Sequence, residues 1–301
     1  MAELALDTAA VPDYDLGMRA FSQVDVFTSE PMLGNPVAVV LDGEGLSDQE
    51  MAKFANWTNL SETTFVLPPT DPAADYLVRI FTPSSELPFA GHPTIGTCHA
   101  WLEAGGTPQS AGSIVQECGI GLVTLRQENG RLAFAAPPLI KDGPVDEADL
   151  APVLDVLGIE RDQVIGAQWA DNGPGWLAVM LKDAEAVLAI KPDFGKAESE
   201  GHGIIGAAPI GLVGTHSDGD VAVEVRAFFS ANGQPTEDPV TGSLNAALAQ
   251  WLLGNGALQS PYRARQGTAL GRQGYVHITQ AEGEIWVGGD AVTVVSGTTS
   301  I

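Results

Sequence analysis

The chain has 301 residues, and its 14 Lys and Arg against 38 Asp and Glu give a formal net charge of −24. A content of 45% hydrophobic and 17% charged residues is typical of a globular protein with a sizeable core. Because basic residues are scarce, no stripe can neutralise phosphates, which argues against nucleic acid and against an anionic membrane surface as partners.

The sequence shows no sign of export or membrane insertion. Residues 1–16 have neither a basic n-region nor a long apolar run, and no stretch approaches 18 consecutive apolar residues. The two cysteines, Cys98 and Cys118, form neither a disulfide framework nor a metal-ligand spacing. We therefore expect a cytoplasmic protein without a metal site, in which residues 1–18 form a loose N-terminal extension.

Hydrophobic periodicity and turn residues predict alternating strands and helices. Ser47 is the predicted cap of an amphipathic helix at 49–57, and Glu62 opens the β-prone run that follows. The other predicted elements, in chain order, are a strand at 78–81, a helix from Pro93, a hairpin at 122–134, helices at 148–157 and 184–190, a strand at 225–228, a helix from Pro239 and a hairpin at 275–287. A Pro-rich, acidic stretch at 137–149 is typical of a linker between domains.

Two segments of the chain repeat one plan. Residues 92–100 align with residues 238–246: Pro, Gly and the final Ala coincide, and Thr97 matches Ser243. Each segment follows a predicted strand, continues as a helix that ends in Trp-Leu, and leads to a hairpin with a central Gly. The repeat predicts an α+β fold of two pseudo-symmetric domains, each a curved mixed sheet around a central helix, with a small-molecule site in the cleft between them.

The aligned prolines indicate where the two central helices begin. Because Pro is favoured at the first helical position, His92 and Asp238 are the predicted N-caps. If the halves face each other, both helix N-termini point into the cleft and offer it free N–H groups and a positive dipole end. Gly91 and Gly242 would then let the backbone approach a ligand closely.

Basic residues are missing around both of these segments. No Lys or Arg lies between residues 79 and 126 or between residues 226 and 263. We therefore expect a small carboxylate substrate to be held by backbone amides and by hydroxyls such as that of Ser243. Glu62 is a third candidate, because a carboxylate beside an apolar strand can have a raised pKa that suits proton transfer near neutral pH.

An ordered series of short motifs connects these residues. They are Gly34-Asn35-Pro36, Asn59-Leu60-Ser61-Glu62-Thr63, Phe81-Thr82-Pro83, Ala90-Gly91-His92-Pro93-Thr94 and Glu237-Asp238-Pro239-Val240-Thr241-Gly242-Ser243. Together, over about residues 21–297, they resemble the phenazine-biosynthesis PhzF-like family of isomerases. The resemblance implies a diaminopimelate-epimerase-like fold, with domains at 19–137 and 145–290. It also allows the last strand, about residues 291–301, to return to the first domain.

The resemblance also implies roles for the site residues. Glu62 corresponds to the family's catalytic glutamate, which moves a proton between carbons while a double bond migrates in a small cyclic hydroxy-amino acid, without cofactor or metal. His92 and Asp238 would assist proton transfer or bind polar groups of the substrate. A homodimer is implied as well. The expected substrate contacts are Asn35, Ser61, Gly91, Gly242 and Ser243.

Two other functions fit the same scaffold. Epimerases and racemases on this fold use two facing cysteines, but Cys98 is predicted inside the first helix and its partner position holds Leu244, which disfavours a two-thiol racemase. A small-ligand-binding protein with little turnover would not need Glu62. The G-x-G-x-x-G pattern at 201–206 lacks the preceding strand and following helix of a dinucleotide site.

Overall fold

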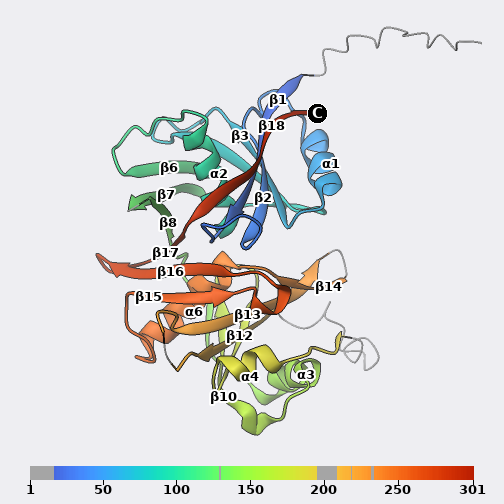
Figure 1. Ribbon diagram of the computed structural model, residues 1–301, viewed down its shortest axis with the longest axis vertical. Helices are drawn as coiled ribbons and strands as arrows, with labels where there is room; N and C mark the ends of the chain where they lie inside the picture. Colours follow the sequence, from blue (N-terminus) through green and yellow to red (C-terminus); the bar gives the residue numbers. More distant parts are fainter. Residues whose placement is uncertain (1–16, 129, 195–208, 218, 232–233) are drawn as a thin grey trace, which may run out of the picture.

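The computed structural model describes residues 17–128, 130–194, 209–217, 219–231 and 234–301. Its two halves lie one above the other in Figure 1. The pattern at 201–206 and residues 1–16 of the expected extension lie outside the described residues. Met18, the last residue of that extension, is instead the first residue of a strand and pairs with Ser300.

The first half consists of β1 (Met18–Val26), β2 (Asn35–Val40), α1 (Asp48–Thr58), β3 (Glu62–Leu67), β4 (Tyr76–Phe81), β5 (Glu86–Leu87), α2 (Gly91–Glu103), β6 (Ser113–Cys118), β7 (Gly121–Glu128) and β8 (Arg131–Ala135). The second half consists of β9 (Lys141–Pro144), α3 (Glu147–Leu157), β10 (Val164–Asp171), β11 (Leu177–Leu181), α4 (Ala184–Ala189), β12 (Ile210–Thr215), β13 (Val223–Ala231), β14 (Gln234–Asp238), α6 (Gly242–Gly254), β15 (Tyr262–Gln266), β16 (Gly274–Ala281) and β17 (Glu284–Gly289). Strand β18 (Ala291–Ser300) ends the chain's regular structure, and 3-10 turns lie at Arg161–Gln163 and Thr268–Leu270.

The two halves share one order of strand pairing. The first runs β18–β1–β2–β3–β4–β6–β7–β8 and the second runs β9–β10–β11–β12–β13–β15–β16–β17. Parallel pairs take the same places in both: β2–β3 matches β11–β12, and β4–β6 matches β13–β15. An antiparallel pair of β8 and β17 joins the halves. The predicted α+β class with two pseudo-symmetric halves is therefore confirmed.

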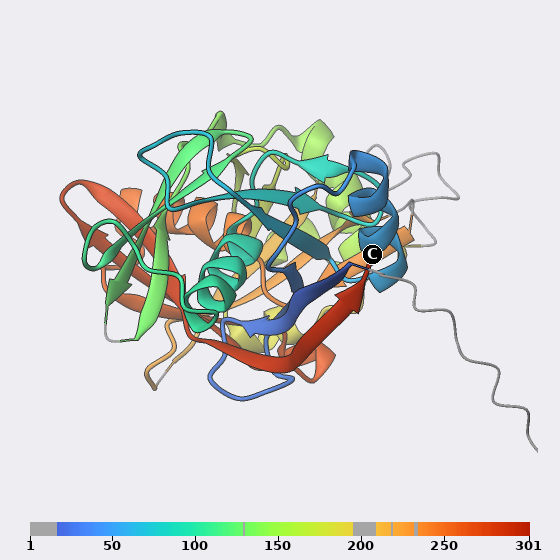
Figure 2. The ribbon, with the colours of Figure 1, turned by 90° about the horizontal axis from the view of Figure 1, so that it is seen from above.

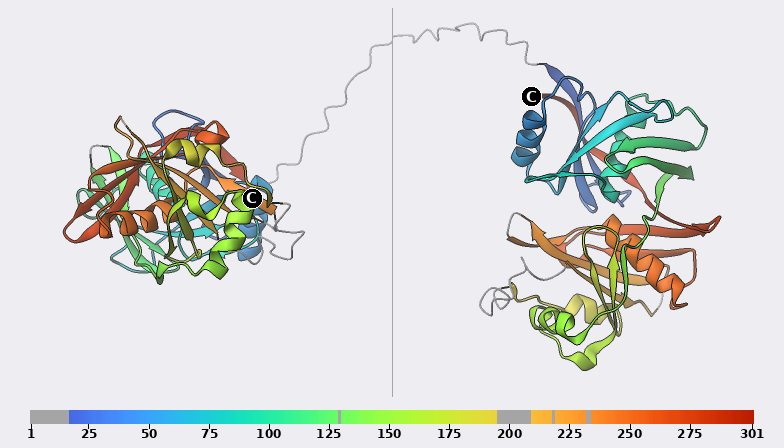
Figure 3. Two further views of the ribbon diagram at one scale, coloured as in Figure 1. Left: turned by 90° about the horizontal axis from the view of Figure 1, so that it is seen from below. Right: turned by 180° about the vertical axis from the view of Figure 1, so that it is seen from behind.

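Two strands extend the matching half-sheets at equivalent edges. The chain crosses back from β17 so that β18 pairs with β1, and the right view of Figure 3 shows this return. In the second half β9 pairs with β10 in the same way. The linker predicted at 137–149 is therefore wrong in part, because it contains β9 and the first residues of α3. Domain boundaries at 137 and 145 stay a prediction.

A buried helix fills the centre of each half. Helix α2 contacts β1, β2, β3, β6, β8 and β18, and it lies inside the curved sheet in Figure 2. Its residues from Gly91 to Cys98 are all buried, and α6 is buried over most of its length. A helix that is apolar nearly all round is stable only in such a core, and small residues let the strands come close. Gly96, for example, faces Val37 of β2 and has no room for a side chain.

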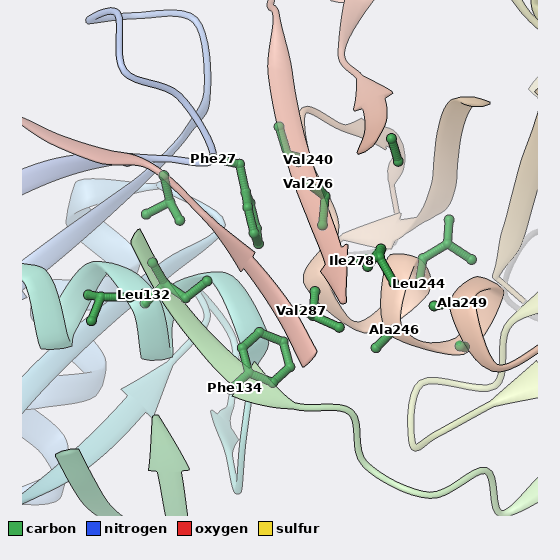
Figure 4. Packing of buried hydrophobic residues seen from close by; sticks show 14 of the residues in the cluster. Phe27, Leu132, Phe134, Val240, Leu244, Ala246, Ala249, Val276, Ile278 and Val287 are labelled. Atoms are coloured by element: carbon green, nitrogen blue, oxygen red, sulfur yellow. The ribbon is translucent and has the colours of Figure 1, made fainter. Parts of the chain in front are cut away.

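One hydrophobic cluster runs through both halves. Figure 4 shows its middle, where Phe134 of β8 lies opposite Val287 of β17. The helices α3 and α4 cover a second cluster on β10 to β13, and α1 covers a third on β2 to β4. Burial of each large apolar side chain contributes roughly 1.5–3 kcal/mol, so these clusters fix how the two central helices face each other.

Candidate active site

Residues far apart in the sequence meet at the junction of the halves. The Oε2 atom of Glu62 lies 3.4 Å from Nδ1 of His92. The amide of Asn35 donates to Oδ1 of Asp238 at 3.0 Å and to the carbonyl of Val240 at 2.9 Å. The same amide nitrogen lies 3.5 Å from His92 Nδ1. The three expected catalytic side chains and Asn35 therefore form one buried polar cluster.

Local structure places Glu62 at the cluster. Ser47 Oγ accepts from the Glu50 N–H and the Glu50 carboxylate accepts from the Ser47 N–H, so α1 starts with a reciprocal cap, as predicted for Ser47. The helix ends at Asn59, whose φ of 54° is left-handed and reverses the chain. Glu62 then begins β3 beside Val37 of β2. The half-buried Ser61 precedes it at this turn.

The two helix starts differ from the prediction. The N-cap of α2 is Ala90, so His92 lies in the first turn, and the N-cap of α6 is Thr241, so Asp238 remains on β14. Pro93 is tolerated inside the first turn because its missing N–H would have no partner there. The Asp238 carboxylate instead accepts from the Thr241 hydroxyl at 2.6 Å. Neither His92 nor Asp238 is an N-cap.

The two helix starts touch each other. A Cβ on Gly91 would lie 2.6 Å from the Phe134 ring and 3.3 Å from Gly242 Cα. A Cβ on Gly242 would lie 3.2 Å from the backbone N of His92. Both glycines are buried, so a side chain at Gly91 would collide with the Phe134 ring, and one at Gly242 would press against the start of α2. The expected convergence of the two helix N-termini is confirmed.

Ser243, the second residue of α6, is fixed from outside its helix. Trp176 Nε1 donates to Ser243 Oγ at 3.1 Å, and the Asn172 amide donates to the Ser243 carbonyl at 2.9 Å. Because Ser243 Oγ accepts from the indole, its hydroxyl hydrogen is left for another acceptor. No sequence signal indicated Trp176 or Asn172, which lie about 70 positions away in the segment between β10 and β11.

Burial gives Glu62 an unusual proton affinity. Desolvation, and next the negative charge of Asp238, raise the pKa of Glu62 to about 8. Among the described residues, none forms a hydrogen bond with its Oε2 atom. At pH 7 this carboxyl is therefore mostly protonated, and its proton can be given to a bound molecule.

The other two side chains take different charge states. Burial lowers the pKa of His92 to about 3, against an opposing contact with the Pro36 carbonyl, so its imidazole is neutral. Burial raises the pKa of Asp238 to about 6, while hydrogen bonds from Thr241 and Asn35 favour its charged form. At pH 7 the cluster thus combines a protonated Glu62, a neutral His92 and a mostly ionised Asp238.

Further buried polar groups that contact Asp238 or its partner Thr241 were not predicted from the sequence. Gln266, at the end of β15, donates to the Asp238 carbonyl at 3.1 Å and to Thr241 Oγ1 at 2.8 Å. Asn245 donates to Gln266 Oε1 at 2.9 Å. One signal was available: a glutamine, Gln116, stands on the equivalent strand β6 of the first half.

The cysteines lie where the sequence predicted packed residues. Cys98 is fully buried within α2, and desolvation raises the pKa of its thiol to about 12. Cys118 is buried at the end of β6, and burial raises the pKa of its thiol as well. Neither side chain belongs to the cluster, so a two-thiol proton transfer has no support in this geometry.

The described parts of the chain contain no group of three or more His, Cys, Asp or Glu side chains arranged to hold a metal ion. None of the helices in those parts has the length and apolar character needed to span a bilayer.

Two halves with matching strand pairings, whose central helices meet beside the buried cluster of Glu62, His92 and Asp238, agree with the isomerase class that the sequence motifs resemble. The chain belongs to the PhzC-PhzF family, described as phenazine biosynthesis-like protein, whose family model matches residues 24–297. The resemblance drawn from the sequence motifs is therefore confirmed.

Named relatives support the same class. The chain is 37% identical to antisense-enhancing sequence 1 of Schizosaccharomyces pombe, over 93% of this chain and 98% of the relative. It is 32% identical to a trans-2,3-dihydro-3-hydroxyanthranilate isomerase of Pseudomonas fluorescens, over 93% of this chain and 99% of the relative. A crystal structure of a PhzF-family protein from Bacillus anthracis superimposes with a TM-score of 0.77 at 25% identity, covering 94% of this chain and 99% of that one. The predicted enzyme class, an isomerase of the PhzF type, is confirmed.

Proposed function

We propose that this enzyme moves a proton between two carbons of a small, cyclic amino- or hydroxy-carboxylic acid, with Glu62 as the acid and base. The observation that carries the proposal is the buried cluster in which Glu62 Oε2 and His92 Nε2 have no hydrogen-bond partner among the described residues. Buried polar atoms are nearly always satisfied, so an unpaired acid beside an unpaired imidazole is suited to a ligand.

The charge states give a balanced proton cycle. Protonated Glu62 gives its proton to one carbon of the substrate, and the resulting carboxylate removes a proton from a second carbon, so that the double bond shifts. Glu62 ends as it began, and the isomer differs from the substrate only in the positions of one hydrogen and one double bond. His92, being neutral, can donate or accept a hydrogen bond to a substrate heteroatom through Nε2.

The substrate carboxylate would be held beside the contact between the helix starts. Helix N-termini attract anions through free N–H groups and the helix dipole, and both α2 and α6 begin here. Ser243 adds a hydroxyl whose hydrogen is free to donate. Gly91 and Gly242 would contact this carboxylate through their backbones, and Asn35 and Ser61 would border the rest of the ligand.

Several finer predictions stay proposals. The relatives named trans-2,3-dihydro-3-hydroxyanthranilate isomerase suggest that compound as the first substrate to test. The cycle above assigns every proton to a side chain of this protein and requires no cofactor. A homodimer and a cytoplasmic location also stay predictions from the resemblance and the sequence.

Exchange with deuterated water tests the proposal. In D₂O with trans-2,3-dihydro-3-hydroxyanthranilate, and with other small cyclic amino acids in parallel, wild-type enzyme should introduce deuterium at one carbon while the double bond moves. Deuterium at a stereocentre with inversion and no double-bond shift would instead identify an epimerase. Binding without any exchange, followed by ligand NMR, would identify a binding protein and contradict the proposal.

A further inference from the structure

We infer that Gln266 is a positioning residue that, through the Thr241 hydroxyl, holds the Asp238 carboxylate as a hydrogen-bond acceptor within the site. Gln266 is fully buried on β15, and none of the hydrogen bonds that it forms with described residues joins it to Glu62 or His92. Its catalytic relevance rests on the proposed function, whereas its effect on Asp238 does not.

The orientation of the Gln266 amide is determined by two backbone groups. The backbone N–H of Thr241, which can only donate, lies 3.0 Å from Gln266 Oε1, so this oxygen is the acceptor. The backbone carbonyl of Asp238, which can only accept, lies 3.1 Å from Gln266 Nε2, so this nitrogen is the donor. The second hydrogen on Nε2 is therefore directed at Thr241 Oγ1, 2.8 Å away.

The orientation of Gln266 also determines which way the next hydrogen bond, from Thr241 to Asp238, is directed. Because Thr241 Oγ1 accepts from Gln266, its own hydrogen is free for Asp238 Oδ2 at 2.6 Å. The other carboxylate oxygen accepts from the Asn35 amide, whose orientation is set in turn by the Val240 carbonyl. Both oxygens of Asp238 thus receive a hydrogen from a donor that cannot reverse, an arrangement that favours the carboxylate over the acid.

Few charged groups in the described part of the chain lie near Asp238. The charge of Glu62 on β3 interacts with it from the first half, and His92 on α2 lies near the same Asn35 amide that donates to Asp238. Glu237, next to it on β14, is ion-paired with Arg226 of β13 at 2.8 Å. Among the described residues, these charged groups donate no hydrogen bond to Asp238, so the Asn35 amide and the Thr241 hydroxyl are the donors that offset its desolvation.

The first half provides a matched control. Gln116 is also fully buried, accepts from the Tyr76 hydroxyl at 3.1 Å and donates to Thr94 Oγ1 at 3.0 Å. No carboxylate follows Thr94 in this chain of bonds. Gln116→Met therefore removes a buried glutamine–threonine hydrogen bond without altering the donors to Asp238.

The test is a carboxyl titration of the intact, ligand-free protein. With ¹³C-labelled aspartate, the Asp238 signal, assigned by its loss in Asp238→Asn, should titrate near 6 in wild type. Gln266→Met and Thr241→Val should each raise this midpoint by about one pH unit, as expected when a hydrogen bond to a charged group is lost. Thr241→Ser and Gln116→Met should leave it unchanged, and the Gln266→Met/Thr241→Val double variant should shift it no further than Thr241→Val.

Unchanged midpoints in folded Gln266→Met or Thr241→Val would overturn the inference, as would an equal shift in Gln116→Met. If Gln266→Met does not fold, the Thr241→Val and Thr241→Ser pair decides. Since no substrate enters this titration, a failure of the exchange experiment would count against the proposed function and leave this result standing.

Discussion

The starts of α2 and α6 hold equivalent places in two half-sheets with the same strand pairings, yet their chemistry differs. In the first half the helix begins before the Pro that the two repeated segments share, and it carries His92 in its first turn. In the second half the helix begins three residues after the Pro and leaves Asp238 on a strand. A repeated backbone plan thus presents a neutral imidazole on one side and a carboxylate on the other, which a symmetric pair could not do.

The two buried glutamines that donate to threonines at these helix starts, Gln116 and Gln266, also differ between the halves. Gln116 donates to Thr94 and the chain of bonds ends inside the first half, where it only satisfies buried polar groups. Gln266 donates to Thr241, which passes its hydrogen on to Asp238. The same glutamine-to-threonine hydrogen bond therefore stays within the core in the first half, but in the second half it is linked to the Asp238 carboxylate. Position in the repeat alone does not identify a functional residue.

The largest expected effect comes from replacing Glu62, whose Oε2 atom has no hydrogen-bond partner among the described residues. Glu62→Gln keeps the shape of the side chain but cannot exchange a proton with carbon, so deuterium incorporation should fall about 10³-fold. The measurement is the initial rate of exchange by NMR, with the exposed Glu128→Gln as the control that should match wild type. A Glu62→Gln rate within about tenfold of wild type would mean that another group moves the proton.

The same substitution should change stability with pH. Burial raises the pKa of Glu62 from 4.5 to about 8. The contribution of Glu62 to the free energy of unfolding of the wild-type protein is therefore highest below pH 4.5, where Glu62 is neutral in both states, and it falls as the pH rises through 8. Glu62→Gln, which never ionises, should be about 5 kcal/mol more stable than wild type at pH 9 and nearly equal at pH 4.5. Urea unfolding at both pH values measures this, and a difference independent of pH would contradict it.

A smaller effect should come from closing the space between the helix starts. Gly91→Ala places a methyl group against the Phe134 ring and Gly242, and it should cost about 2 kcal/mol of unfolding free energy by overpacking. Gly254→Ala, at the end of α6 with no atom within 4 Å of the new Cβ, should be neutral or slightly stabilising. Equal losses for both alanine variants would show that the contact between the helix starts is not tight.

The smallest expected effect lies at the rim of the carboxylate site. Trp176→Phe keeps the buried ring but removes the donor to Ser243 Oγ, which frees the hydroxyl to rotate. The KM for the substrate should rise about threefold with kcat unchanged, since a neutral hydrogen bond contributes about 1 kcal/mol or less. A change in kcat alone would place Ser243 in the proton transfer instead of in binding.

Much of this architecture could be predicted because periodicity and turn chemistry are local. The capped helix α1, the two Gly hairpins and the repeat of the central helices follow from residues that are close in sequence. The predicted start of α6 was wrong because a long-range contact determines the position of Asp238, whose carboxylate accepts a hydrogen bond from Asn35 of the other half. Gln266 and Trp176 were missed because the burial of a polar side chain depends on which strands cover it.

The order in which the two carboxyl groups ionise tests the central claim most directly. In ligand-free protein labelled with ¹³C at Glu and Asp carboxyls, Asp238 should titrate near 6 and Glu62 near 8. In Asp238→Asn the Glu62 midpoint should fall, because one cause of its high pKa is the neighbouring negative charge. A Glu62 midpoint below that of Asp238, or one that does not move in Asp238→Asn, would contradict this account of the site.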